Sequence, residues 1–277
     1  MFSISATPLP GSPKAGQAEV RLRDLRDRIA GIERAGRRVG GARSIPFAVP
    51  AIDSVLPDSG LAVGALHEMA SGGADTAEGS AAALFVAGIL TRMEGSVLWA
   101  MEHGDLFAPG LAGAGLHSDR VVFVEADRHV LSVMEEGLRH PGLAAVVGEI
   151  TGRLTLVASR RLQLAAEATG TLAMALRRSP RFDDPVLREP TAAVTRWRVA
   201  PLPSPPPLPH APETPGLGRA RWQLDLVRCR GGQPGSWIVE ACDATGGLAL
   251  VADMADRPDQ EAGRRTGVGH AAGHIAA

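Results

Sequence analysis

Short apolar segments alternate with helical patterns through the middle of the chain, and this alternation limits the folds open to it. Parallel strands cannot be joined by tight turns, so each pair needs a crossover connection, which is usually a helix. The spacing therefore predicts an α/β fold, with a mainly parallel, twisted sheet flanked by helices. Strands are predicted at 65–69, 97–101, 121–124, 144–147 and 171–176, and helices at 80–92, 129–139 and 159–168.

The pattern changes after residue 179, where strand-like segments follow one another without helices between them. Residues 222–228 alternate apolar and polar side chains, and a run of turn residues follows at 231–235. These features predict an antiparallel extension at the C-terminal end of the sheet. Its strands are expected at 194–199, 222–228, 236–241 and 248–251.

The remaining regions have a different composition from the core, which is expected at 45–252. Residues 1–17 are rich in Pro, Gly and Ser and are expected to form a disordered tail, and residues 253–277 a flexible one. Within the core, eight of the fifteen residues from Pro201 to Pro215 are proline. Such a run excludes a regular helix or strand and predicts an exposed, polyproline-like loop over 201–218.

Residues 18–43 have the pattern of an amphipathic, arginine-rich helix. Leu22, Leu25, Ile29 and Ile32 follow a/d heptad spacing and form an apolar stripe. Two interpretations are open: the helix packs on its own domain, or it docks on another subunit or partner. A short helix has little stability by itself, so the stripe is a candidate partner-binding surface, including for self-association.

The charge balance limits the ways in which this chain could bind nucleic acid. Its 29 basic and 30 acidic residues give a formal net charge of −1, so the whole protein cannot act as a polycation. Residues 19–43, by contrast, carry eight arginines and four acidic residues. Any weak contact with single-stranded DNA is therefore expected from this helix, and the candidate residues are Arg21, Arg28, Arg37 and Arg38.

A cytoplasmic location without membrane contact is expected. The N-terminus lacks the basic and apolar regions of a signal peptide, and the longest near-apolar run is about half a bilayer span. Only Cys229 and Cys242 could form a disulfide. If the hairpin places Arg228 opposite Trp237, the two cysteines lie roughly 20 Å apart along the strands, so reduced thiols are expected.

The junction after the first core strand is where a parallel α/β protein often binds an anion, through a glycine-rich loop and a helix N-terminus. Here the loop is expected at 70–80, but it lacks the Gly-Lys-Ser/Thr ending of a phosphate-binding loop. Lys14 is the only lysine, and Asp75 and Glu78 would repel phosphate. The loop is therefore interpreted as degenerate, with no cofactor expected. Its members are Ser71, Gly72, Gly73, Gly79 and Ser80.

Several of these segments resemble the core of RecA-type recombinases. IPFAVPAIDSVL at 45–56 and GLAVGALHEM at 60–69 are similar to the family's approach to its ATP loop. The MEH sequence at 101–103 is similar to a strand end whose glutamate, here Glu102, polarises the attacking water. The resemblance covers about residues 45 to 252 and implies a RecA-like core.

Departures from the RecA pattern favour loss of ATP hydrolysis. Gly148 occupies the place of the magnesium-binding acid, and Glu149, one residue further, is expected to point to the other face. Arg177 and Arg178 replace the family's asparagine–glutamine sensor. The segments that match the two DNA-binding loops, 151–155 and 179–193, are short. Glu102 is therefore interpreted as a relic, since phosphoryl transfer depends on positioned cations. No catalytic residue and no metal site are expected.

Three further phrases are similar to the ImuA family of RecA-related proteins: DLFAPGL at 105–111, ASRRLQLAAE at 158–167 and CRGGQPGSW at 229–237. The resemblance implies a non-enzymatic accessory role in SOS-induced mutagenesis. The implied partners are an ImuB-like relative of the Y-family polymerases, an error-prone C-family polymerase and RecA. A working RecA-like ATPase or recombination regulator, and a SulA-like inhibitor of cell division, remain alternatives.

Overall fold

A computed structural model describes residues 44–253, except for 74, 141, 180, 182–183 and 209. The strands are β1 (Ser44–Ile45), β2 (Leu61–Ala62), β3 (Leu66–Ser71), β4 (Ser96–Met101), β5 (Val121–Glu125), β6 (Leu143–Thr151), β7 (Leu172–Arg178), β8 (Thr195–Leu202), β9 (Arg221–Cys229), β10 (Gly235–Glu240) and β11 (Ala249–Asp253). The helices are α2 (Pro50–Asp53), α3 (Asp75–Thr91), α4 (Ala108–Ala112), α5 (Val130–Arg139) and α6 (Leu156–Thr169), with 3-10 turns at Pro57–Ser59, Ser118–Arg120, Asp127–His129 and Pro185–Arg188.

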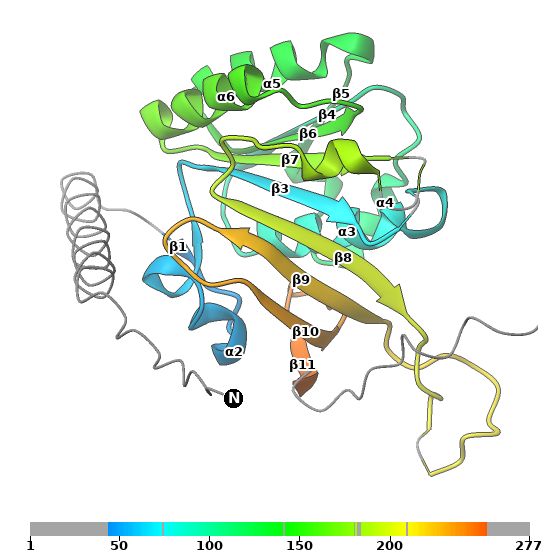
Figure 1. Cartoon of the computed structure of the whole chain (residues 1–277). Helices are drawn as coiled ribbons and strands as arrows, with labels where there is room; N and C mark the ends of the chain where they lie inside the picture. The colour runs from blue at the N-terminus through cyan, green and yellow to red at the C-terminus, as the bar shows by residue number, and fades with distance from the viewer. Residues whose placement is uncertain are drawn as a thin grey trace, which may run out of the picture.

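A nine-stranded sheet forms the centre of the molecule (Figure 1), in the order β11-β10-β9-β8-β3-β7-β6-β4-β5. The six strands from β8 to β5 are mutually parallel. Strands β9, β10 and β11 continue the sheet in antiparallel pairs. The predicted fold class, a mainly parallel sheet with an antiparallel C-terminal extension, is therefore confirmed.

Helices cover both faces of the sheet, and the sheet therefore separates two apolar core layers. On one face, α5 and α6 lie side by side (Figure 1) and bury Met134 and Leu162 against β3, β6 and β7. On the other face, α3 is apolar on all sides from Ala81 to Leu90 and buries Phe85, Val86 and Leu90. A helix without a polar face must be covered, and the segment 45–61 together with α4 supplies that cover.

An aromatic cluster fastens the antiparallel strands to the parallel part of the sheet. The ring centroid of Trp197 on β8 lies 5.3 Å from that of Phe47 and 6.3 Å from that of Trp237 on β10. Phe85 of α3 stacks on Phe47 at 5.8 Å and meets Trp222 of β9 edge-on at 6.4 Å. Such pairs add about 0.5–1.5 kcal/mol each beyond the burial of their area.

The predicted register of the β9–β10 hairpin is wrong. Trp237 pairs with Leu224, not with Arg228, and Gly235 pairs with Leu226. The connection is longer than a tight turn because its backbone is bound elsewhere: the Arg230 amide donates to the Val194 carbonyl at 2.8 Å, and the Gln233 amide to the Val55 carbonyl at 3.0 Å. Both cysteines are nevertheless free thiols. Burial raises the pKa of the Cys242 thiol to about 12.

The proline-rich stretch begins inside β8, since Pro201 pairs with Trp222. Proline is tolerated there because β3 pairs with β8 only as far as Val199, so the Pro201 nitrogen is not needed as a ladder donor. The following loop projects away from the sheet at the lower right of Figure 1. No helix among the described residues is long and apolar enough to cross a bilayer. The predicted tail 1–17, helix 18–43 and tail after residue 253 lie outside the described residues.

Candidate functional site at the carboxyl edge of the sheet

The glycine-rich loop joins β3 to α3 in only three residues, 72–74. The Gly72 amide donates to the Val199 carbonyl of β8 at 2.8 Å, and the Ser71 hydroxyl donates to the Gly73 carbonyl at 2.8 Å. A phosphate-binding loop needs eight residues and backbone amides directed at the anion. Here the link is shorter, and one of its amides is already bound to the sheet.

Gly79 and Ser80 lie in α3, which corrects their predicted place in the loop. The helix begins at Asp75, five residues before the predicted start. Acidic residue types are favoured in the first turn of a helix, and the sequence carries Asp75 and Glu78 at this point. Of the residues predicted in the loop, Ser71, Gly72 and Gly73 line one pocket together with Ala70.

Glu102 follows the end of β4 and is half-buried. Strands β6 and β7 separate β4 from β3, so Glu102 and the glycine-rich loop lie on the same edge of the sheet but not on neighbouring strands. Within the described residues its carboxylate makes no hydrogen bond or ion pair. Nothing in the described structure therefore poises this carboxylate as a base.

Gly148 and Glu149 point to opposite faces of β6, as predicted. A Cβ at Gly148 would lie 2.1 Å from the Met134 sulfur and 3.1 Å from a Val130 methyl, so this face is filled by α5. Glu149 lies on the α3 face, where its carboxylate accepts a hydrogen bond from the Trp99 indole at 2.8 Å. It is thus Glu149, and not residue 148, that shares the side of the sheet with the helix following the glycine-rich loop.

The Glu149 carboxylate is already engaged by protein groups. Arg178 forms an ion pair with it and contacts Asp105 at 3.0 Å with its other terminal nitrogen. Burial raises the pKa of Glu149, and the bonds from Trp99 and Arg178 oppose that shift. An acid bound in this way is a poor magnesium ligand, because the metal would have to displace an arginine. No cluster of three metal-ligating side chains occurs among the described residues.

A buried charge cluster that the sequence patterns did not predict lies on the opposite face of β3, β7 and β8. Glu68 is 1% exposed and accepts from the Arg196 Nε at 2.9 Å and from the Thr191 hydroxyl. Arg177, 2% exposed, lies with Nη1 3.6 Å from the Glu68 carboxylate and donates to the Gly152 carbonyl at 2.6 Å. The cluster binds the segment 179–193 to the sheet.

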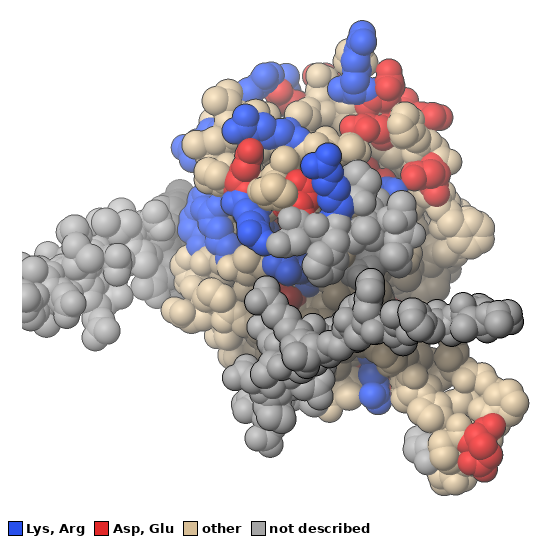
Figure 2. Space-filling model, turned by 45° about the vertical axis from the view of Figure 1, so that its right-hand side comes forward, with Lys and Arg blue, Asp and Glu red and all other residues tan. Residues whose placement is uncertain are grey.

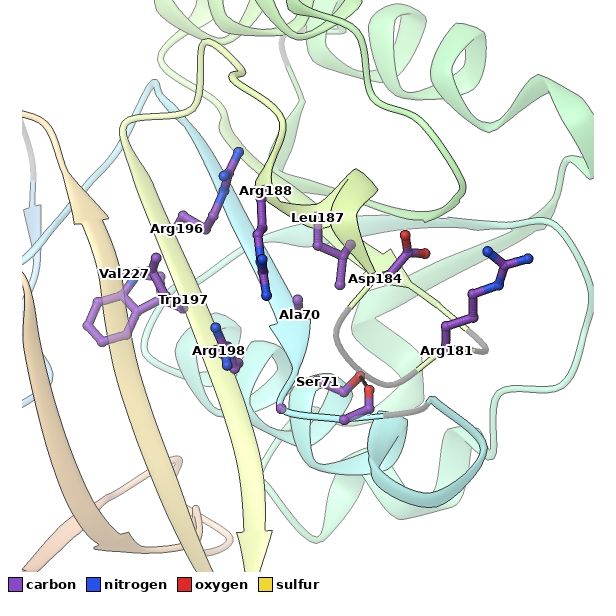
Figure 3. Close-up of a pocket in the computed structure, with 12 residues that line it drawn as sticks. Ala70, Ser71, Arg181, Asp184, Leu187, Arg188, Arg196, Trp197, Arg198 and Val227 are labelled. Carbon is purple, nitrogen blue, oxygen red and sulfur yellow. Dashed lines mark hydrogen bonds between the residues drawn. The ribbon is translucent and has the colours of Figure 1, made fainter. Parts of the chain in front are cut away.

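A pocket of about 180 Å³ opens beside this cluster, between the glycine-rich loop, the segment after β7 and strand β8. We call it the arginine pocket and define it by six of its lining residues: Arg181, Leu187, Arg188, Arg196, Arg198 and Val227. In Figure 3 the side chains of Arg188 and Arg198 extend into the same space, and Arg181 extends away from them. The pocket also contains one carboxylate, Asp184, which already accepts from Ser179 at 2.7 Å.

Comparison with known proteins decides the family. Two proteins named Protein ImuA, from Caulobacter vibrioides strains NA1000 / CB15N and ATCC 19089 / CIP 103742 / CB 15, are each 40% identical to the chain over 238 residues. The match covers 80% of this chain and 96% of each relative. The chain belongs to the ImuA family.

The ImuA-family chain also has a RecA-like fold. It superposes on the crystal structure of the RadB recombinase with a TM-score of 0.51 at 15% identity, covering 75% of this chain and 100% of that one. At this level of identity the likeness concerns the fold alone. No protein-family model matches the chain.

The predicted and observed site residues of this ImuA-family member overlap only in part. The predicted partner-binding stripe, Leu22 to Ile32, and the candidate DNA contacts, Arg21 to Arg38, lie outside the described residues. Arg196 and Arg198, which line the arginine pocket, were not singled out from the sequence. The sequence did contain a signal for these two residues, because Arg196 and Arg198 alternate with the apolar residues Trp197 and Val199. In a strand, this alternation places the two arginines on the face opposite the aromatic cluster.

Proposed function

We propose that this protein is a non-catalytic, RecA-like accessory factor of SOS-induced mutagenesis. It would scaffold a translesion synthesis complex that contains an ImuB-like Y-family protein and an error-prone C-family polymerase, and it would contact RecA. Membership of the ImuA family is the observation that carries the proposal. A cytoplasmic location and weak contact with single-stranded DNA through Arg21, Arg28, Arg37 and Arg38 are parts of the same proposal.

Two features of the edge support a role without ATP hydrolysis. The glycine-rich link is too short for a phosphate-binding loop, and its Gly72 amide is bound to Val199. The acid on the α3 side, Glu149, is paired with Arg178. Phosphoryl transfer needs cations placed on the phosphates. The described residues at this edge offer no lysine, and the Glu149 carboxylate is held by an arginine in place of a metal.

Calorimetric titration of the full chain with ATP and magnesium checks the non-catalytic part. We expect no binding in the micromolar range and no turnover above buffer. The Glu102→Gln variant should behave like the native protein, because Glu102 is expected to activate no water. Micromolar affinity together with turnover that is lost in Glu102→Gln would replace this proposal with the ATPase alternative.

Co-purification checks the scaffold part, with the ImuB-like partner co-expressed from the same organism. Changing Leu25 and Ile29 together to Asp should abolish partner capture, since each aliphatic side chain contributes about 1.5–3 kcal/mol when fully buried. The core should remain folded, as seen from an unchanged melting temperature. The matched control is Arg23→Asp with Arg26→Asp, which alters the charge of the helix but leaves the stripe intact.

If the Leu25/Ile29 double variant still captures the partner, the other interpretation holds, in which the helix packs on its own domain. Failure of the native chain to capture any member of the complex would contradict the scaffold role itself.

A further inference from the structure

We infer that the arginine pocket binds a short acidic segment of a protein partner, one that also carries an aliphatic side chain. The inference rests on the proposed scaffold role for the existence of a partner. The site itself is argued from the described side chains alone. Four arginines line the pocket, the side chains of Arg188 and Arg198 extend into the same space, and Asp184 is the single carboxylate among its described lining residues.

The arginines of the pocket differ in how the protein uses them. Arg196 is committed to the fold: its Nε binds Glu68 at 2.9 Å, and its Nη2 donates to the Glu189 carbonyl at 2.7 Å. Arg181 and Arg198 are exposed, and their side chains make no hydrogen bond or ion pair within the described residues. Each guanidinium presents five N–H donors in a planar fork that fits a carboxylate in two parallel bonds.

The pocket also has an apolar component. Leu187 and Val227 line it between the arginines, and Val227, on β9, is 45% exposed. Arginine is enriched at the centres of protein interfaces, where lysine is depleted. A peptide that pairs carboxylates with an aliphatic side chain would satisfy both components.

A nucleic-acid backbone fits the same surroundings less well. A phosphodiester strand continues beyond a small pocket on both sides, and each phosphate needs a cation. Three carboxylates belong to residues on or next to the pocket: Asp184, Glu189, and Asp225, whose position on β9 lies opposite that of Arg198 on β8. Figure 2 shows acidic side chains among the basic ones on the face in view, and the net charge is −1. A short acidic segment brings only a few charges near these carboxylates, whereas an extended polyanion brings one with every nucleotide.

Phage display of random 12-residue peptides on the full-length protein tests the inference, with counter-selection on the variant Arg188→Glu/Arg198→Glu. Selected peptides should be rich in Asp and Glu and contain Leu, Ile or Val. A synthetic, fluorescein-labelled member should bind with at least tenfold lower affinity to the double variant, and to the native protein when its acids are replaced by Asn and Gln. The matched control is Arg160→Glu, an exposed α6 arginine outside the pocket, which should bind the peptide like the native chain.

Several outcomes would overturn the inference. One is enrichment of no acidic peptide; another is equal binding by the native chain and the double variant. Displacement of the peptide by a dT20 oligonucleotide at lower concentration than by the unlabelled peptide would make the pocket a nucleic-acid site instead. Should the double variant melt early, Arg198→Ala replaces it, since this side chain is exposed. No partner protein is used, so failure here is distinct from failure of the scaffold role, which the co-purification reports.

Discussion

Replacing Glu68 by alanine is expected to lower the free energy of unfolding by about 3–5 kcal/mol, the cost of removing one partner from a buried ion pair. The carboxylate lies between Arg196 at 2.9 Å and Arg177 at 3.6 Å, and it also accepts from the Thr191 hydroxyl. Without it, two guanidinium groups remain in the core with no opposite charge. Arg177 suffers most, because its Nε and Nη1 already lack a hydrogen-bond partner.

Urea unfolding followed by tryptophan fluorescence measures this change. Glu68→Gln should fall between the native protein and the alanine variant, because the amide oxygen keeps one acceptor but loses the charge. Glu136→Gln, on a side chain that is 82% exposed, is the matched control and should change stability by less than about 0.5 kcal/mol. If Glu68→Ala lowers the free energy of unfolding by less than about 1 kcal/mol, the buried charge cluster does not stabilise the fold as expected.

Acidification from pH 6.5 to pH 4 is expected to remove about 3 kcal/mol of stability through His67 alone, at about 1.36 kcal/mol per pKa unit. Burial lowers the pKa of His67 from 6.5 to about 4 in the folded protein. In this window the unfolded chain takes up a proton at His67 and the folded protein does not. Protonation therefore favours unfolding, and the free energy of unfolding falls as the pH falls.

Burial is the main cause of the lowered pKa of His67; the hydrogen bond to Ala62 opposes it, and the bond from Thr195 is compatible with the neutral ring. Its Nε2 donates to the Ala62 carbonyl at 2.8 Å, which places the proton on that nitrogen. Its Nδ1 accepts from the Thr195 hydroxyl at 2.7 Å, and that oxygen accepts from the Trp197 indole at 2.9 Å. The Thr195 hydroxyl donates its hydrogen to Nδ1, so a proton on Nδ1 would point at another hydrogen unless the hydroxyl turned away.

Urea unfolding at a series of pH values checks the prediction with two histidine variants. His67→Asn should be less stable at pH 7 but should show a flatter dependence on pH between 6.5 and 4. His117→Asn, at an exposed position, should keep the native slope. If the slope of His67→Asn equals that of the native protein, the acid sensitivity arises from other groups.

The fold was predictable because its signals are local. The strands of the parallel region are short apolar runs separated by helical patterns, and the requirement for crossovers leaves few arrangements. The single-lysine composition and the missing Gly-Lys-Ser/Thr ending indicated a degenerate loop without any coordinates. Two predictions at element ends were wrong, the start of α3 and the register of β9 against β10. Each depends on where a loop backbone finds its hydrogen-bond partners.

The sequence by itself determined the family, the α/β class and the alternation that puts Gly148 and Glu149 on opposite faces. Only the tertiary structure decided what those residues meet: α5 fills the space at Gly148, and Arg178 binds Glu149. It also decided that Glu68, Arg177 and Arg196, far apart in the chain, share one buried site. The physical reason is that strand periodicity assigns a side chain to a face, whereas burial, charge pairing and the arginine pocket arise from strand order, which places β3 between β7 and β8.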